Sequence, residues 1–333
     1  MNRVTIRDIA ALAGVSTSTV SRALNDHPAI SEETKAVIQE ACRQLNYVPD
    51  MTARGLAGRM TNTIGVIIPD ISSPYFSALC TSIENHAAKK GFRVMLTNTL
   101  HDPKYELEAI DQMLSQQVDG MIISPYSPES QAKHGAFLEN VPCVYVGSNH
   151  GPDCSYVEAD NERGTYEAAQ YLYHLGHRKI IFLGGRDGSR TLEQRLNGYR
   201  RSMLLNGLTP EWFTAPEGSG SMRKWCYERA ARLFSSGFVP VAIIAYSDIM
   251  AMQVLAAAKE HQLRAPEDFS IIGFDNISFC QLPQVQLTSV SQHKFQTGHL
   301  AVERLLEKIS GGVGQTHDIL RTELMIRSTC RRI

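Results

Sequence analysis

From Thr61 onward the sequence alternates short apolar runs with segments of helical spacing, and this alternation sets narrow limits on the fold. The runs are continuous stretches of apolar residues, which is typical of strands buried on both faces of a parallel sheet. Parallel neighbours need a crossover connection, and the segments between the runs have the length and periodicity of helices. The pattern therefore predicts repeated βαβ units in doubly wound parallel sheets.

Two sets of these units are predicted. The first is expected to have strands at Ile64–Ile68, Phe92–Leu96, Gly120–Ile123 and Val141–Val146, and helices at Phe76–Lys90 and Tyr105–Gln116. The second begins after Asp160 and is expected to have strands at Lys179–Leu183, Val241–Tyr246 and Phe269–Ile272, and helices at Glu162–Leu175, Thr191–Asn206 and Asp248–Lys259. Two similar halves leave a cleft where the carboxyl ends of the strands face each other, and small molecules bind in such clefts.

Residues 5 to 25 predict a separate unit of two short helices joined by a glycine turn. Thr5 can cap the first helix together with Asp8, Gly14 closes the turn, and Ser16 can cap the second helix. A third helix is expected at Ser31–Leu45. The positions expected to face inward in the three helices are Ile6, Ile9, Ala10, Ala13, Val20, Leu24, Ala36, Val37, Ala41 and Leu45, and Val15 is expected to fill the gap between the first two.

This arrangement is a helix-turn-helix. It leaves Thr17, Ser18 and Arg22 outward near the start of the second helix, where recognition helices carry their base-reading side chains. A small bundle that only packs is the alternative. Residues 1–60 hold 7 Lys and Arg against 6 Asp and Glu. Phosphate binding would therefore depend on single arginines, backbone amides and helix ends, and not on bulk charge.

A proline break follows the third helix at Asn46-Tyr47-Val48-Pro49-Asp50. The segment 51–58 that comes next has too little apolar surface to be a stable helix by itself. The head, the Asn-Tyr-x-Pro break and the Ala-Arg-Gly-Leu-Ala sequence at residues 53–57 resemble the LacI/GalR family of bacterial transcription repressors, and the resemblance extends over the whole chain.

The resemblance implies a small all-α helix-turn-helix head at residues 1–48, a hinge at 49–60 and an effector-binding and dimerisation domain at 61–333. The domain is expected to have two lobes and to resemble a type I periplasmic binding protein. The first lobe would comprise about 61–160 and 292–320, and the second about 161–291 and 321–333. Crossings are thus implied near Asp160-Asn161, near Ser291-Gln292 and around Leu320.

In that family the hinge helices of two subunits pair in the minor groove, and a leucine from each kinks the duplex. Leu56 holds that position here. In the alternative interpretation the segment is a surface linker whose leucine packs on the next domain. Arg22 is expected to contact a guanine. The full set of residues expected to contact DNA is Thr5, Ser16, Thr17, Ser18, Thr19, Ser21, Arg22, Asn25, Tyr47, Ala53, Arg54, Leu56 and Ala57.

For the cleft, the resemblance implies six effector-binding residues, namely Tyr75, Phe76, Thr191, Arg195, Ser247 and Asp275. A carboxylate can accept two hydroxyl protons, a guanidinium offers a rigid fork of donors, and an aromatic face can cover a ring. Each residue also has a purely structural alternative. Arg195 could be a solvent-exposed charge on a helix, Asp275 could cap a turn, and Phe76 could belong to the hydrophobic core.

The chain also departs from its relatives' pattern in the cleft. Gly147 stands where relatives tend to have an aspartate. Near Ser221 this chain lacks the aromatic residue that stacks on the ligand in relatives, and whether Trp225 takes its place is left open. The basic residues Arg186, Arg190, Arg195, Arg223 and Lys224 suggest an anionic ligand such as a sugar phosphate.

Other classes of function have less support. The seven cysteines are scattered and include no C-x-x-C pair, which argues against a disulfide framework or zinc site and favours the cytoplasm. There is no apolar signal core and no run of about 18 apolar residues. The glycines of residues 184–188 lack the G-x-G-x-x-G spacing of a dinucleotide site, and His174 and His177 fit structural roles better than metal binding. No G-x-S-x-G, P-loop or H-E-x-x-H sequence of an enzyme occurs.

We therefore expect no enzyme activity, cofactor or metal. The expected function is a transcriptional repressor whose affinity for operator DNA is controlled by a small effector, a sugar or sugar derivative. The expected partners are a pseudo-palindromic operator, that effector, and a second copy of the chain in a homodimer. A solute-binding protein without a DNA role is the alternative.

Overall fold

The structure is a computed structural model that describes residues 4–24, 27–47, 60–138, 141–151, 153–216, 218–237 and 242–333. The chain forms two compact units, Met1–Thr61 and Asn62–Ile333. In the described part of the chain, no helix has the length and apolar character needed to cross a membrane.

The first unit contains the three expected helices, α1 (Ile6–Ala13), α2 (Thr17–Leu24) and α3 (Glu32–Gln44). At the start of α1 the Asp8 carboxylate accepts hydrogen bonds from the Thr5 amide (2.7 Å) and the Thr5 hydroxyl (2.8 Å). Gly14 ends α1 in the left-handed conformation, with φ of 69°, and the Ser16 hydroxyl accepts from the Thr19 amide at the start of α2. The predicted caps and turn are therefore confirmed.

The core of this unit lies between the three helices. Its buried members are Ile9, Ala10, Val20, Ala23, Ile38 and Ala41. The inward face predicted for α3 is partly wrong, because Ala36 is exposed and Val37 is 52% exposed. Ile38 is the buried residue instead, and it lies on one stripe with Ala41, Cys42 and Leu45 at helical spacing.

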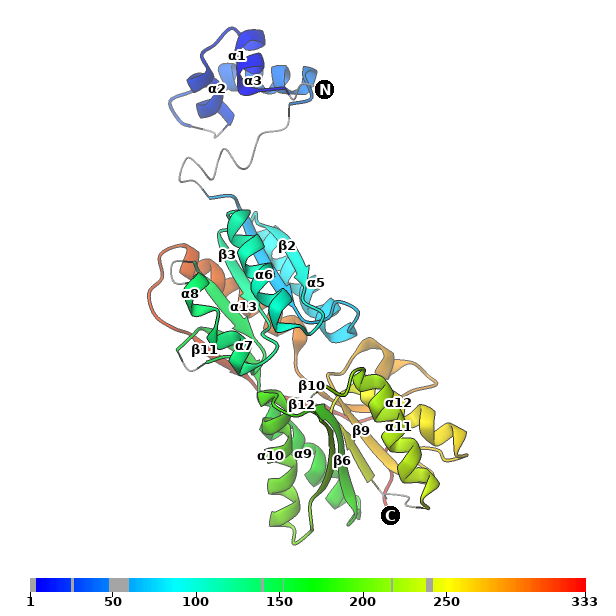
Figure 1. The fold of residues 1–333 in the computed structure, drawn as a ribbon. Coiled ribbons are helices and arrows are strands. Elements are labelled where there is room, and N and C mark those ends of the chain that lie inside the picture. Colours follow the sequence, from blue (N-terminus) through cyan, green and yellow to red (C-terminus); the bar gives the residue numbers. More distant parts are fainter. Residues whose placement is uncertain are drawn as a thin grey trace. The chain divides into compact units, whose positions relative to one another are not determined.

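The second unit contains two six-stranded sheets, which Figure 1 shows in separate lobes with helices on either side. Sheet A has the order β11-β5-β4-β3-β1-β2, and sheet B has the order β12-β10-β9-β8-β6-β7. All neighbours are parallel except β10 and β12. The strands of sheet A are β1 (Thr63–Ile68), β2 (Arg93–Asn98), β3 (Gly120–Ile123), β4 (Cys143–Val146), β5 (Tyr156–Ala159) and β11 (His317–Leu320). Those of sheet B are β6 (Ile180–Arg186), β7 (Glu211–Ala215), β8 (Ala242–Ala245), β9 (Ser270–Phe274), β10 (Thr288–Ser291) and β12 (Glu323–Met325).

The helices cover both faces of each sheet, as doubly wound topology requires. In the lobe of sheet A, α5 (Pro74–Lys89) and α13 (Lys294–Ile309) pack on one face and α6 (Pro103–Ser115) packs on the other. In the lobe of sheet B, α11 (Met222–Ser235) and α12 (Asp248–Glu260) pack on one face. The helices α9 (Asn161–His174) and α10 (Arg190–Leu205) pack on the other. The remaining short elements are α7 (Pro128–Ala132), α8 (Gly135–Leu138) and η1 (Ser278–Gln281).

The chain passes between the two sheets after β5, after β10 and after β11. Both lobes are therefore discontinuous in sequence. The first crossing leads from Ala159 into α9, the second leads from Ser291 into α13, and the third joins Leu320 to β12.

One expected strand differs in character from the prediction. The run Phe92–Leu96 was expected to form a buried strand, but β2 lies at the edge of sheet A and Leu96 is 42% exposed. An edge strand has a neighbour on one side only, so its apolar residues are less covered.

A close approach of two helices explains the sequence Asn-Gly-Tyr at residues 197–199. A Cβ atom on Gly198 would lie 1.9 Å from the carbonyl oxygen of Glu162, so only glycine lets α10 meet α9 at this point. The fully buried Tyr199 donates its hydroxyl proton to backbone carbonyls of Ile180 and Glu211 and accepts from the Glu211 amide at 2.8 Å. This segment therefore fixes the position of α10, which carries cleft residues.

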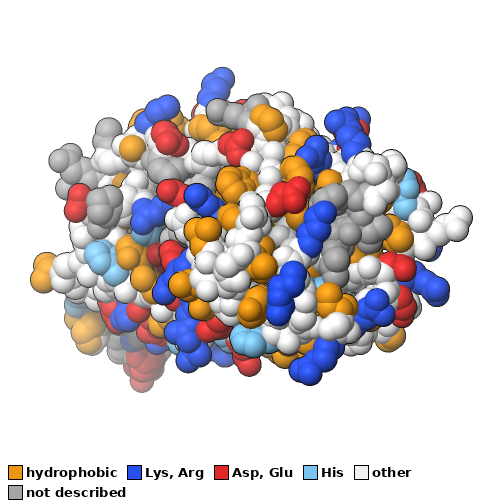
Figure 2. All heavy atoms as spheres, turned by 90° about the horizontal axis from the view of Figure 1, so that it is seen from below, with side chains coloured by type: hydrophobic (Ala, Val, Ile, Leu, Met, Phe, Trp, Pro, Cys, Tyr) orange, Lys and Arg blue, Asp and Glu red, His pale blue; other side chains and the backbone are white. Residues whose placement is uncertain are grey.

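The surface is mixed in charge, in agreement with 33 Lys and Arg against 34 Asp and Glu in the whole chain. On the face drawn in Figure 2, basic and acidic side chains are interspersed and apolar side chains are scattered among them. This face has no large field of one sign that would attract a polyanion.

Candidate functional site

The second helix of the head presents its polar side chains as the sequence predicts. Thr17, Ser18 and Arg22 are exposed, whereas Val20 is buried. The Ser16 hydroxyl lies 2.7 Å from the Ser18 hydroxyl, so the cap also orients a residue of the outward face. These side chains are thus on one accessible face of a helix that is locked in place by its own core.

The other residues expected to contact DNA fall into two groups. Thr5 and Ser16 lie at the starts of α1 and α2, Thr19 and Ser21 lie within α2, and Tyr47 is half-buried against the core of the head. Asn25, Ala53, Arg54, Leu56 and Ala57 lie outside the described residues.

A cleft of about 720 Å³ lies between the two lobes of the second unit. All six expected effector residues line it, namely Tyr75, Phe76, Thr191, Arg195, Ser247 and Asp275. The chain brings them together because each follows the carboxyl end of a strand, and these ends of parallel strands meet at one edge of a sheet. Tyr75 and Phe76 begin α5, Thr191 and Arg195 lie on α10, Ser247 caps α12, and Asp275 follows β9.

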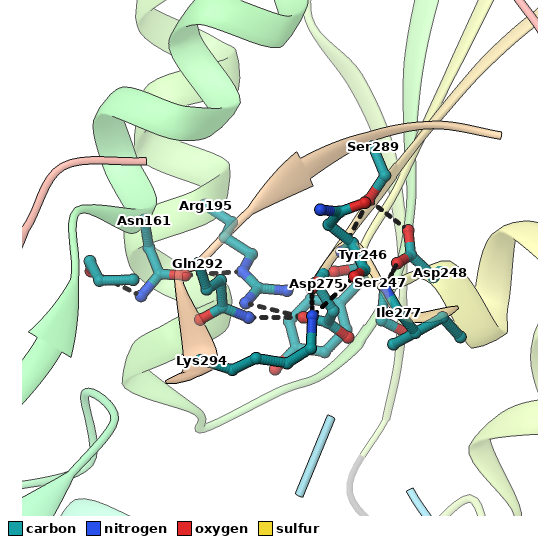
Figure 3. A network of polar contacts seen from close by, with 12 residues as sticks. Asn161, Arg195, Tyr246, Ser247, Asp248, Asp275, Ile277, Ser289, Gln292 and Lys294 are labelled. Atoms are coloured by element: carbon teal, nitrogen blue, oxygen red, sulfur yellow. Dashed lines mark hydrogen bonds and ion pairs between the residues drawn. The ribbon is translucent and has the colours of Figure 1, made fainter. Parts of the chain in front are cut away.

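Arg195 is the centre of a polar network in this cleft (Figure 3). It is 3% exposed, and its Nε donates to the Asn161 side chain at 2.9 Å while its Nη1 donates to the Tyr246 carbonyl. The guanidinium carbon lies 3.6 Å from the ring centre of Phe274 and 4.7 Å from that of Tyr246. These contacts fix the orientation of the guanidinium before any ligand is bound, and they argue against a solvated helix charge.

Asp275 lies beside this arginine, with 3.8 Å between its Oδ1 and Arg195 Nη2. Gln292 donates to the same carboxylate oxygen at 2.5 Å. Burial raises the pKa of the Asp275 carboxyl, and the nearby Asp248 raises it further, while Arg195 opposes the shift. The result is a carboxyl group that is held in position and incompletely solvated, which suits it to accept hydrogen bonds from a ligand.

The backbone at Asp275 is unusual, because its φ is 111°. A residue other than glycine in this region is strained, and such strain is often found at ligand sites. Lys294 holds the turn by donating to the carbonyls of Asp275 (3.2 Å) and Asn276 (2.6 Å). Lys294 is the first residue of α13, so the second crossing segment fixes this carboxylate.

Asp248, although adjacent to Ser247, does not face the cleft. It is fully buried, and its carboxylate accepts from the Ser289 hydroxyl at 2.6 Å and the Ile277 amide at 2.8 Å. Ser247 lines the cleft and accepts from the Met250 amide at 3.3 Å, so it also caps α12.

The two aromatic residues at the start of α5 pack edge to face, with ring centres 5.2 Å apart. Tyr75 contacts the hydrophobic cores of both lobes, whereas Phe76 contacts only the core of its own lobe. Burial raises the pKa of the Tyr75 hydroxyl, and the charge of Asp275 adds to this effect. Tyr75 is therefore close to the charged groups of the opposite lobe.

Several cleft residues were not among the six expected effector residues. Asn161 and Gln292 lie at the first two crossings, and Tyr126 and Asn149 lie near the boundary of the lobes. Arg186, which the sequence suggested only as one of a basic group, also lines the cleft. Arg186 donates to the Tyr126 hydroxyl at 3.2 Å, and Asn149 accepts from the Arg190 amide at 3.1 Å, so both pairs join one lobe to the other. The crossings themselves were a usable signal, because a polar residue at a hinge between two lobes is close to the cleft.

The departures from the relatives' pattern have structural consequences. Gly147 lines the cleft with a φ of 84°, so this position supplies no acceptor side chain. Trp225 is not among the cleft residues, and it lines a smaller pocket together with Trp212. Met222, one residue after Ser221, lines the cleft. Arg190 and Lys224 do not line the cleft either, whereas Arg186, Arg195 and Arg223 do.

Two glycines of residues 184–188, Gly184 and Gly185, serve packing. A Cβ on Gly184 would lie 2.4 Å from the sulfur of Met250, and one on Gly185 would lie 2.5 Å from Leu192. Both have positive φ. They let the end of β6 approach α12 and α10, which accounts for them without a phosphate cradle.

Comparisons with known proteins agree with this architecture. Residues 5–50 match the family described as bacterial regulatory proteins, lacI family, and residues 169–330 match the periplasmic binding protein-like domain. The HTH-type transcriptional repressor CytR of Escherichia coli (strain K12) is 32% identical over 99% of this chain and 97% of its own length. The HTH-type transcriptional repressor PurR of Haemophilus influenzae (strain PittEE) is 32% identical over 99% of each chain.

Solved structures give the same result. The lac repressor dimer bound to operator and the anti-inducer ONPF superposes with a TM-score of 0.88 at 27% identity, over 99% of this chain and 100% of that chain. The complex of the transcriptional regulator CelR with cellobiose has a TM-score of 0.72 at 25% identity, over 98% and 100%. The chain belongs to the lacI family of bacterial regulatory proteins.

Proposed function

We propose that this protein is a repressor that binds operator DNA as a homodimer. A small polyhydroxylated effector in the cleft either weakens or strengthens this binding. The observation that carries the proposal is the pairing of Arg195 and Asp275 in the cleft of a chain whose head exposes Thr17, Ser18 and Arg22. The head supplies sequence recognition, and the cleft supplies control.

The recognition step follows from the exposed face of α2. Arg22 can form a bidentate contact with a guanine in the major groove, and the short hydroxyl side chains can contact base edges or phosphates. Because one head makes few contacts, two heads joined in a dimer are needed to select one site among many. A pseudo-palindromic operator follows from the twofold symmetry of such a dimer. The segment with Leu56 is proposed, from the family resemblance, to bind the minor groove.

The control step follows from the two-lobed cleft. The Arg186–Tyr126 and Arg190–Asn149 contacts join the lobes, so a ligand that favours one lobe arrangement changes these contacts and shifts the balance between arrangements. The relative placement of two first lobes in a dimer would then decide whether both heads fit one operator. The sign of the response depends on which arrangement the effector prefers.

The charges of the cleft favour a neutral ligand. Its basic residues are Lys133, Arg186, Arg195 and Arg223, and its acidic residues are Asp70, Glu129, Asp187 and Asp275. These charges balance, whereas a sugar phosphate would need a local excess of positive charge. We therefore favour a sugar or another uncharged polyol over a sugar phosphate.

Two measurements test the proposal. In the first, the protein selects binding sites from a pool of random duplexes, and we expect a twofold symmetric sequence to be enriched. In the second, sugars, sugar phosphates, nucleobases and small acids are screened by thermal shift, because a ligand of the folded state raises its apparent stability. A compound that raises the melting temperature should also change the affinity for the selected duplex.

The alternative of a solute-binding protein without a DNA role predicts a different outcome. Ligand binding would persist, but no duplex would be preferred over random competitor with or without ligand. That result would refute the repressor proposal and leave the cleft assignment intact.

A further inference from the structure

Two neighbouring helices of the first lobe bring three metal-binding side chains together, away from the cleft residues described above. His86 lies on α5, and His299 and Glu303 lie one turn apart on α13. One nitrogen of each histidine and one carboxylate oxygen all lie within 4.8 Å of one another. In the described part of the chain this is the only such group of three.

The close approach of α5 and α13 creates this cluster. A Cβ on Gly298 would lie 2.8 Å from the Ser82 side chain and 3.0 Å from the Leu79 carbonyl, so glycine is needed for the helices to come this near. The Ser82 hydroxyl donates to the Phe295 carbonyl at 2.6 Å and ties the two helices at the same level. His86 is one turn beyond Ser82, and His299 follows Gly298. The juxtaposition is therefore a consequence of backbone packing.

His86 contacts both other members of the cluster, and His299 has unused hydrogen-bonding capacity. His86 Nε2 lies 2.5 Å from Glu303 Oε1, and the rings of His86 and His299 have centres 3.9 Å apart. His299 makes no hydrogen bond to another residue of the described chain, and it is exposed. Two imidazoles in contact repel each other when both are protonated, whereas a shared cation would attract both as neutral ligands.

We propose that His86, His299 and Glu303 form a zinc site that joins α5 to α13. Two imidazole nitrogens and one carboxylate oxygen are a ligand set of Zn²⁺ in sites that keep a fourth position for water. In a tetrahedral Zn²⁺ sphere the ligand atoms lie roughly 3.4 Å apart, given metal–ligand distances of about 2.1 Å. The His86 and Glu303 atoms are 2.5 Å apart, below this value, and all three ligand atoms lie within 4.8 Å of one another, so small side-chain movements would bring them into a zinc sphere. Mg²⁺ and Ca²⁺ prefer all-oxygen sets and are not expected to bind here.

One neighbour competes with the metal. Lys90 Nζ lies 3.0 Å from the same Glu303 oxygen that His86 contacts. The Lys90 side chain is 44% exposed, so it can leave the carboxylate for solvent when a divalent cation arrives. Removal of this ammonium group should therefore tighten metal binding, which a merely structural ion pair would not predict.

The bound metal would stabilise the pairing of two helices that border the cleft. The first turn of α5 carries Tyr75 and Phe76, and α13 begins at Lys294, which holds the Asp275 turn. A cross-link between these helices would make the first lobe more rigid without occupying the effector site.

The test is a zinc titration of the full chain, freed of metal with a chelator and set in competition with a chromophoric zinc indicator. We expect His299→Ala and Glu303→Ala each to weaken the site by at least 30-fold, and Lys90→Met to strengthen it. The control is His174→Ala, which removes another exposed helix histidine whose Nδ1 contacts the Gln170 carbonyl. This variant should bind zinc like the wild type.

Two further readouts complete the test. Cobalt(II) should give the visible absorption of a tetrahedral site in the wild type and not in His299→Ala, and zinc should raise the melting temperature of the wild type more than that of Glu303→Ala. Circular dichroism without metal verifies that all variants are folded. Zinc affinity that is equal in the wild type, His299→Ala and Glu303→Ala would overturn the proposal, as would weaker binding by Lys90→Met.

Discussion

Replacement of Asp275 by asparagine separates the proposed binding role of this carboxylate from its cost to stability. Asparagine keeps the shape and an oxygen that can accept the hydrogen bond from Gln292. Arg195 loses its neighbouring charge at 3.8 Å but keeps its bonds to Asn161 and the Tyr246 carbonyl and its contact with the Phe274 ring. The variant should therefore fold, and the loss should fall on the ligand.

The expected loss of effector affinity follows from one charge-assisted hydrogen bond. Such a bond contributes about 1.5–3 kcal/mol, which corresponds to a dissociation constant roughly 10- to 150-fold higher. The assay is calorimetric titration of Asp275→Asn and wild type with the compound that gives the largest thermal shift. Affinity for the operator without effector should be unchanged.

The expected effect on stability has the opposite sign. Burial raises the pKa of Asp275 above its ordinary value of 3.8, so the folded protein holds this proton more tightly than the unfolded chain does. Ionisation of the carboxyl therefore reduces stability progressively as the pH rises above about 4 through the raised pKa. Asparagine does not ionise. The melting temperature of Asp275→Asn relative to the wild type should thus increase between pH 4 and pH 8.

Two results would refute this reasoning. An unchanged effector dissociation constant would remove Asp275 from the binding site. The second result is a melting temperature of Asp275→Asn that is lower than that of the wild type by the same amount at every pH. It would mean that the carboxylate stabilises the fold and that burial does not oppose its ionisation.

Three further substitutions test other parts of the structure. Arg22→Ala should lose about 1–3 kcal/mol of discrimination at one base pair in each half-site, measured with a panel of single-base operator variants; an equal loss on every sequence would indicate a phosphate contact instead. Gly198→Ala should destabilise the second unit by about 1–3 kcal/mol or more in urea unfolding, because the added Cβ would lie 1.9 Å from a backbone carbonyl. An unchanged free energy of unfolding would contradict the close approach of α9 and α10. Tyr199→Phe should lower the free energy of unfolding by about 1–3 kcal/mol in the same assay, since it leaves backbone groups on β6 and β7 unpaired. A change below about 0.5 kcal/mol would mean that water replaces the hydroxyl.

The head shows why some features could be predicted from local sequence. The caps at Thr5 and Ser16 and the turn at Gly14 depend on residues within three positions of each other, so their hydrogen bonds can be inferred from spacing. The face of α3 was harder, because a shift of one residue turns a helix by about 100°. Ile38 and not Val37 is buried, and only the position of α1 and α2 decides between them.

The body shows a similar division. The apolar runs predicted most of the central strands, because burial on both faces leaves few polar residues in them. No element was expected from the sequence at β5, β7, β10, β11, β12, α11 or α13. The strands among these are short, and three of them lie at sheet edges, where the apolar signal weakens. Helix α13, by contrast, carries a buried apolar stripe that includes Ala301, Val302 and Leu305 at helical spacing, and this stripe is visible in the sequence.

The sequence by itself determined the two kinds of unit, the polar outward face of the second helix of the head and the residue types of the cleft, because periodicity, caps and strand ends are local properties. Only the tertiary structure decided which side chains meet. Asn161 and Arg195 bond across 34 residues, and His86 and Glu303 meet across 217. Such contacts depend on how sheets and helices pack, since distances between elements are set by shape and volume and not by position along the chain.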